Sequence, residues 1–126
     1  MSAFHAPYHA AALAKDADAI LACMTDTIRM HSPTKMTPFE GKVIVRFLFG
    51  HLMEVLEDFQ FTTIVEDNGT AVMFFTCTIG GRPAEGCDVL TFDGDGQIAE
   101  FKVLIRPLKA LERLNEIMGE RLKAFQ

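Results

Sequence analysis

One acidic residue stands out because it shares a strand face with large apolar side chains. In the stretch GCDVLTFD (residues 86–93), Asp88, Leu90 and Phe92 have the same parity, and a strand places such residues on one face. A carboxyl group in an apolar pocket has a raised pKa and can donate a hydrogen bond to a developing oxyanion. The alternative is a strand carboxylate paired with a Lys or Arg at the mouth of a pocket.

Three other side chains could add to this chemistry. His31 ends an expected strand, where an imidazole can act as a base near neutral pH or simply bond to the backbone. Arg106 ends the last expected strand and could anchor an anionic ligand or pair with a nearby carboxylate. His51 flanks an apolar helix stripe and could line a pocket or be a satisfied core histidine.

The periodicity of apolar residues predicts the elements that position these side chains. Helices are expected at residues 7–14, 16–24, 41–58 and 107–125, and strands at 26–32, 59–66, 71–79, 86–93 and 97–106. A loop is expected at 33–40, and Asn68-Gly69 predicts a hairpin turn. This order indicates an α+β domain in which a strand meander follows a long helix.

The long helix and the strands are both expected to contribute apolar faces to the core. Its predicted apolar face comprises Val43, Ile44, Phe47, Leu48, Leu52, Val55, Leu56 and Phe59. The strands are apolar on both parities, as in Val72-Met73-Phe74-Phe75, whereas a half-solvated sheet would alternate. A second subunit is the simplest cover for the outer sheet face, so we expect a homodimer.

Composition narrows the class of protein further. The chain has 126 residues, which fits one domain over residues 1–126, and its net charge of −5 argues against a nucleic-acid partner. No apolar run approaches the ~20 residues that cross a bilayer, and the N-terminal stretch is a poor signal peptide, so a cytoplasmic protein is expected. His5 and His9 lack a matching third ligand, so no metal site is predicted.

The element order and several local signatures resemble the nuclear transport factor 2-like superfamily, and more narrowly its SnoaL-like, ketosteroid-isomerase-like branch. The matching segments are Asp16 with the helix after it, residues 30–33, residues 39–42, residues 86–93 and residues 96–100. The resemblance covers nearly the whole chain. It implies a cone-shaped, cystatin-like fold: a curved antiparallel sheet wrapped around the long helix, with N-terminal helices, a C-terminal helix and an apolar pocket at the open end.

The resemblance also implies roles for particular residues. Similar isomerases use a pocket Tyr and a protonated Asp as an oxyanion hole, with a second Asp as the base. By motif order, Tyr8 and Asp88 fall at the first two positions. The base position is Ser32, which has no useful basicity, so the adjacent His31 is the candidate base. Its parity is opposite to that of Ser32, which leaves open whether it faces the pocket.

Three hypotheses follow. In the leading one, a cofactor-free protein binds a small hydrophobic carbonyl compound and isomerises, hydrates or cyclises it. Its predicted catalytic residues are Asp88, Tyr8 and His31, and its predicted ligand-binding residues are Ser32, Phe47, His51, Phe74, Leu90 and Arg106. The second hypothesis is a non-catalytic carrier or sensor with the same cavity. The third is a structural dimer whose cavity is filled by its own Phe and Met side chains.

Overall fold

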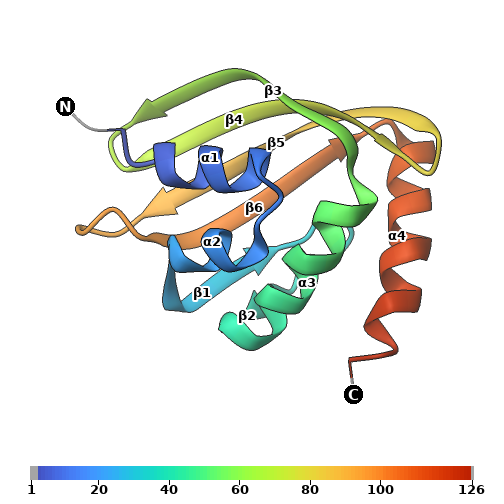
Figure 1. The fold of residues 1–126 in the computed structure, drawn as a ribbon, viewed down its shortest axis with the longest axis horizontal. Helices are drawn as coiled ribbons and strands as arrows, with labels where there is room; N and C mark the ends of the chain where they lie inside the picture. The colour runs from blue at the N-terminus through green and yellow to red at the C-terminus, as the bar shows by residue number, and fades with distance from the viewer. Residues whose placement is uncertain (1–2, 126) are drawn as a thin grey trace.

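The structure, a computed structural model, describes residues 3–125 and has the predicted α+β class (Figure 1). In chain order its elements are α1 (Ala6–Leu13), α2 (Ala17–Ala22), β1 (Met24–His31), β2 (Phe39–Glu40), α3 (Lys42–Val55), β3 (Glu57–Asp67), β4 (Thr70–Ile79), β5 (Arg82–Phe92), β6 (Ile98–Arg106) and α4 (Leu108–Leu122). The predicted elements are all present with shifted ends. Strand β2 was missed, because its two residues lie inside the expected loop.

The strands form one curved sheet in the order β2-β1-β6-β5-β4-β3. Strands β3 to β6 make the predicted antiparallel meander. Strand β1, however, pairs with β6 in parallel, so the sheet is mixed and not wholly antiparallel as predicted. A parallel pair needs a crossover connection in place of a hairpin, and the chain between β1 and β6 supplies one through α3 and the meander.

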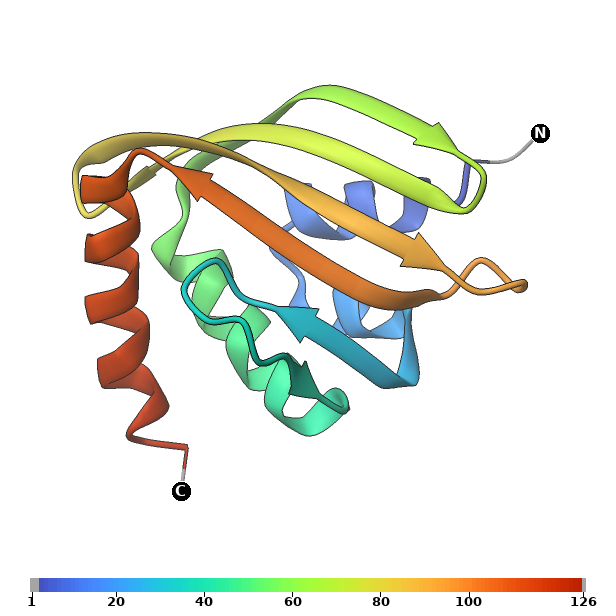
Figure 2. The ribbon, with the colours of Figure 1, turned by 180° about the vertical axis from the view of Figure 1, so that it is seen from behind.

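Three of the four described helices lie on one side of the sheet, and the fourth stands at its end. Helices α1, α2 and α3 cover the inner, concave face, and α4 stands at the end of the sheet where β6 finishes (Figure 1). Seen from behind, the outer face carries none of the helices that the structure describes (Figure 2). Among residues 3–125, no helix is both long enough and apolar enough to cross a bilayer.

Helix α3 presents to the core a face that matches the predicted one only in part, through Leu48, Leu52 and Val55. Its buried residues are Val45, Leu48, Phe49, Leu52, Met53 and Val55. Val43, which was predicted to face inward, is 78% exposed, and Phe47 lies only half-buried on the far side. The helix is apolar almost all round between residues 43 and 49, so its periodicity does not specify one buried face.

Candidate functional site

Asp88 lies on the inner face of the sheet, as its parity with Leu90 and Phe92 predicted. On β5 it is opposite Met73 of β4 and Val103 of β6, and it is only 4% exposed. No other charged side chain in residues 3–125 is buried. Among those residues it makes no ion pair with a Lys, Arg or His, so the alternative of a pocket-mouth ion pair is not what the structure shows.

The side chain that contacts the Asp88 carboxyl is Tyr8 of α1. The Tyr8 hydroxyl donates a hydrogen bond of 2.8 Å to Oδ2 of Asp88. Tyr8 is 2% exposed, and its ring makes edge contacts with Phe61 and Phe101 at centroid distances of 6.3 Å and 5.1 Å. The packing of these rings fixes where the hydroxyl points.

Burial sets the proton affinity of this pair. It raises the pKa of Asp88 to about 7, although the hydrogen bond from Tyr8 acts in the opposite direction. Burial also raises the pKa of Tyr8 well above its ordinary value, and the neighbouring charge of Asp88 adds to that effect. Near neutral pH, Asp88 can therefore exchange a proton while Tyr8 keeps its own.

Helix α1, which carries Tyr8, is held at its N-terminus by a carboxylate from β3. Glu66 accepts hydrogen bonds of 3.0 Å from the backbone N–H groups of Phe4 and His5, and its Oε1 lies 2.5 Å from Nδ1 of His5. We call these three contacts the Glu66 clasp. A carboxylate at a helix N-terminus satisfies backbone donors that lack a partner within the helix. The clasp therefore fixes the end of the helix one turn away from Tyr8.

A small apolar cavity adjoins the pair. Its volume is about 20 Å³, which is room for roughly one water-sized group. Besides Tyr8 and Asp88 its walls are apolar, and they include Phe49, Leu52, Met53, Phe101, Val103 and Leu114. Of the described residues that line the cavity, Tyr8 and Asp88 alone have titratable side chains. Phe101 and Val103 share the inward parity of their strand, a signal by which the sequence could have identified them.

A second, larger apolar cavity of about 80 Å³ lies between α3, α4 and the segment after β1. Ser32 lines this cavity and not the one beside Asp88. Pro33, Leu52 and Leu114 line both cavities. The two spaces are therefore neighbours that share these side chains as a wall.

His31 does not reach the Tyr8–Asp88 pair, which corrects its predicted role as the base. Ile28 and Met30 take the inward parity of β1, so His31 projects from the outer face. Its Nε2 lies 3.0 Å from Oε2 of Glu100 on the parallel neighbour β6. It lines a shallow groove on that face and does not line the cavity beside Asp88.

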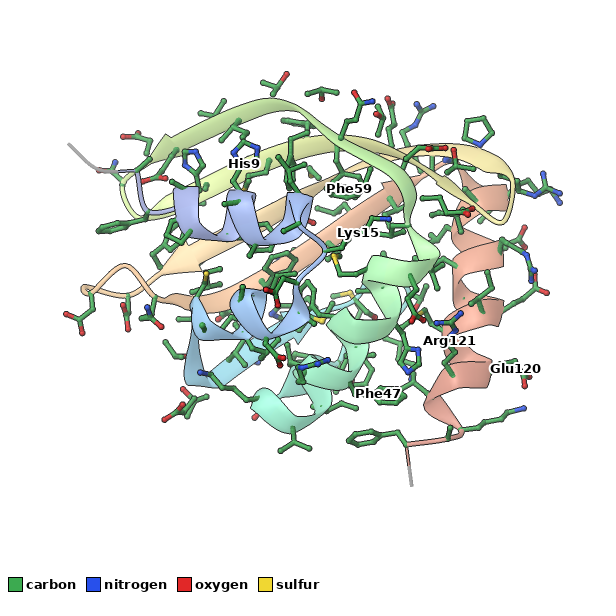
Figure 3. All side chains as sticks on the ribbon, viewed as in Figure 1. His9, Lys15, Phe47, Phe59, Glu120 and Arg121 are labelled. Carbon is green, nitrogen blue, oxygen red and sulfur yellow. The ribbon has the colours of Figure 1, made fainter. Side chains whose placement is uncertain are left out.

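Two predicted ligand-binding residues lie between α3 and α4. The ring of Phe47 packs against those of His51 and Phe125 at centroid distances of 4.4 Å and 4.7 Å. Nδ1 of His51 accepts a hydrogen bond of 2.9 Å from Arg121 of α4, which lies between the two helices in Figure 3. Because α3 is turned from its predicted orientation, neither Phe47 nor His51 lines the cavity beside Asp88.

The other predicted ligand-binding residues also lie outside that cavity. Leu90 is fully buried in the core. Phe74 is 44% exposed on the outer face, because its parity is opposite to that of the buried Met73. Arg106 pairs with Glu85 of the adjacent strand at 2.7 Å, which was the alternative to an anion anchor. Within residues 3–125, no three His, Cys, Asp or Glu side chains gather as metal ligands would.

Solved structures share this architecture. An uncharacterised bacterial protein with a cystatin-like fold from Silicibacter pomeroyi DSS-3 is 26% identical with a TM-score of 0.92, over 98% of this chain and 87% of that one. A steroid delta-isomerase from Pseudomonas aeruginosa is 28% identical with a TM-score of 0.89, and the match covers 97% of this chain and 90% of that one. An epoxide hydrolase/cyclase-like enzyme of pyran ring formation in salinomycin, 18% identical with a TM-score of 0.69 over 82% and 88%, shares the fold.

The sequence profile of one domain family gives a more direct assignment. A comparison with curated proteins yields no significant match. The profile of the SnoaL-like domain, however, matches residues 6–101, a span that runs from the start of α1 into β6 and contains both Tyr8 and Asp88. The resemblance inferred from the sequence is thereby confirmed, and the chain belongs to the SnoaL-like domain family.

Proposed function

We propose that this protein binds a small apolar carbonyl compound and catalyses an acid–base reaction on it, such as an isomerisation or a cyclisation. The observation that carries the proposal is the buried Tyr8–Asp88 hydrogen bond at the end of an apolar cavity. Perturbed carboxyl groups beside a cavity are concentrated at catalytic sites. The likeness to a steroid delta-isomerase at 28% identity supports the same class of reaction.

In the proposed mechanism Asp88 moves the proton, since His31 faces the other way. Ionised Asp88 takes a proton from the carbon next to the carbonyl, so that a C–H bond breaks and an O–H bond forms on the carboxyl. The electron pair of the C–H bond passes into an enolate, whose charge lies on the carbonyl oxygen. If the ketone carries a β,γ double bond, the enolate is conjugated with it, and transfer of the proton from Asp88 to the γ-carbon shifts the double bond and restores the carboxylate.

Tyr8 is the proposed stabiliser of the enolate. In the resting state its hydroxyl donates to the Asp88 carboxylate. Once Asp88 is protonated, its oxygen is a weaker acceptor, and the Tyr8 O–H can turn to the new oxyanion. A carbonyl oxygen is about the size of a water molecule, which is what the 20 Å³ cavity admits.

The test is exchange of the hydrogens next to the carbonyl, measured by NMR in deuterated water across a panel of apolar ketones. Ketones that raise the melting temperature are chosen first, because a ligand that binds only the native state stabilises it. We expect exchange with the wild-type protein, loss of about 100-fold or more in Asp88→Asn, and a smaller loss in Tyr8→Phe. Equal exchange in all three proteins would exclude the mechanism.

A second candidate function is a structural dimer without chemistry. The small volume beside Asp88 favours it, because a cavity of 20 Å³ leaves no room for the body of a ligand unless side chains move. The absence of thermal stabilisation by every compound in the panel would support this second function.

The proposal includes a homodimer formed through the outer sheet face. Val65, Phe74 and Leu104 are 57%, 44% and 50% exposed on or near that face. Large apolar side chains gathered on a face without a helix mark an interaction surface. A second copy that packs the same face against this one would bury them with two-fold symmetry.

A further inference from the structure

The cavity of about 80 Å³ beneath α4 has the properties of a chamber for an apolar ligand body. Leu48 and Leu52 of α3 face Leu114 and Met118 of α4 across it. If about 10–15 Å³ holds one water-sized group, the chamber accepts roughly five to eight such groups. That is the size of a short aliphatic chain or one ring.

One charged side chain lines this chamber. It belongs to Lys35, an exposed residue in the segment between β1 and β2, and the other lining residues among 3–125 are apolar or uncharged. The Lys35 Nζ lies 5.5 Å from the centroid of the Phe39 ring, which also lines the chamber. Within residues 3–125 Lys35 has no carboxylate partner. The positive charge of Lys35 therefore favours an anionic group at this chamber, although the net charge of the whole protein is −5.

The chamber adjoins the space beside Asp88. Pro33, Leu52 and Leu114 line both, so a rotation of the Leu52 and Leu114 side chains would join the two volumes. A ligand that spanned them would place a carbonyl group beside Tyr8 and Asp88 and its apolar body beneath α4. A second carboxylate next to Asp88 would be repelled, so an acidic group on this ligand belongs at the opposite end, where Lys35 lies.

We propose that the chamber beneath α4 binds the body of an apolar monocarboxylate, with Lys35 as the partner of its carboxylate. The inference rests on the proposed function and names the class of its substrate: a carbonyl compound with an acidic group at the end remote from the carbonyl. The polar groups at the two ends of the joined space thus set both the orientation and the approximate length of the ligand.

The experiment compares octanoate with its neutral counterpart octan-1-ol by calorimetry at low salt. We expect the wild-type protein to bind octanoate more tightly than octan-1-ol. The Lys35→Gln variant should bind octanoate about threefold to tenfold more weakly than the wild type, with the same affinity for octan-1-ol. Lys109→Gln is the matched control, because Lys109 is exposed near the start of α4 and does not line the chamber. Met118→Phe, which fills the chamber, should weaken both ligands.

Equal affinity of the wild-type protein for the two ligands would overturn the proposal that Lys35 binds the carboxylate. So would a ratio of the two affinities that is the same in Lys35→Gln as in the wild type. If Met118→Phe binds both ligands as tightly as the wild type does, the ligands do not bind in the chamber beneath α4. The outcome is separable from that of the reaction, because Asp88→Asn should keep the preference for octanoate. If Lys35-dependent binding occurs but no ketone exchanges its hydrogens, the subsite stands and the proposed catalysis fails.

Discussion

At the scale of single residues, the molecule places a carboxyl group where its ionised form is unfavourable. A buried carboxylate without a cationic partner costs several kcal/mol, and among residues 3–125 only the Tyr8 hydroxyl donates a side-chain hydrogen bond that offsets this cost. An apolar residue of similar size would pack at this position without the penalty. A stability cost at a cavity wall is common where a side chain serves chemistry, and this supports a functional role for Asp88.

The pH dependence of stability tests this view of Asp88. Its pKa is about 7 in the folded protein against 3.8 as the reference, so the folded state binds more protons between these values. The contribution of Asp88 to the free energy of unfolding is fully present below pH 3.8 and is lost as the pH rises through about 7. The total fall is on the order of 4 kcal/mol. Urea unfolding of the wild-type protein and Asp88→Asn across this range measures the difference. The same pH slope in both proteins would contradict a raised pKa.

At the scale of elements, the site depends on how α1 is attached to the sheet. The helix is Ala6–Leu13, and its first turn lies against Glu66 at the end of β3. A helix of this length is not stable alone, so its position comes from tertiary contacts. The hydroxyl of Tyr8 can be placed beside Asp88 only if the helix end is fixed, which is what the Glu66 clasp does.

Replacement of Glu66 by Gln should loosen α1. The variant loses the charge and one acceptor oxygen, so we expect about 1 kcal/mol less unfolding free energy and faster amide exchange in α1. Burial raises the pKa of Glu66, but the bonds from His5 and Phe4 outweigh it and lower the pKa overall. The stabilisation is therefore present at neutral pH and lost in acid.

Tyrosine fluorescence offers a local readout of this change, because Tyr8 is the only Tyr and the chain has no Trp. The control is Glu57→Gln, an exposed change at the other end of β3. If the two variants show the same fluorescence, α1 amide exchange and stability, the clasp has no role in positioning Tyr8.

The sequence predicted the sheet side of the site better than the helix side. Strict alternation on β5 fixed the direction of Asp88, because a period of two has only one inward set. On α3 the apolar residues surround the helix, and only packing against the sheet selects Phe49 and Met53 for the core in place of Val43 and Phe47. The same limit applies to His31, whose orientation depends on which parity of β1 the core takes.

At the scale of the whole molecule, the outer sheet face should determine the oligomeric state. We expect sedimentation to give about twice the chain mass of 14.0 kDa for the wild-type protein, and the monomer mass for Phe74→Glu. A charge at Phe74 would be buried without a partner in the dimer. Val43→Glu is the control, because Val43 is 78% exposed on α3, away from the sheet. A wild-type monomer, or a Phe74→Glu dimer, would rule out this interface.

The parallel pairing of β1 with β6 has a consequence for how the chain acquires its native structure. Among the described strands, β1 pairs with the two-residue β2 and with β6, and β6 lies about seventy residues further along the chain. Tyr8 and Asp88 are likewise 80 residues apart. Such distant pairings make folding slow, since loop entropy is lost before the contacts form. We therefore expect the first third of the chain to complete its ordering only when the last strand docks, so that the interior beside Tyr8 and Asp88 is acquired late in folding.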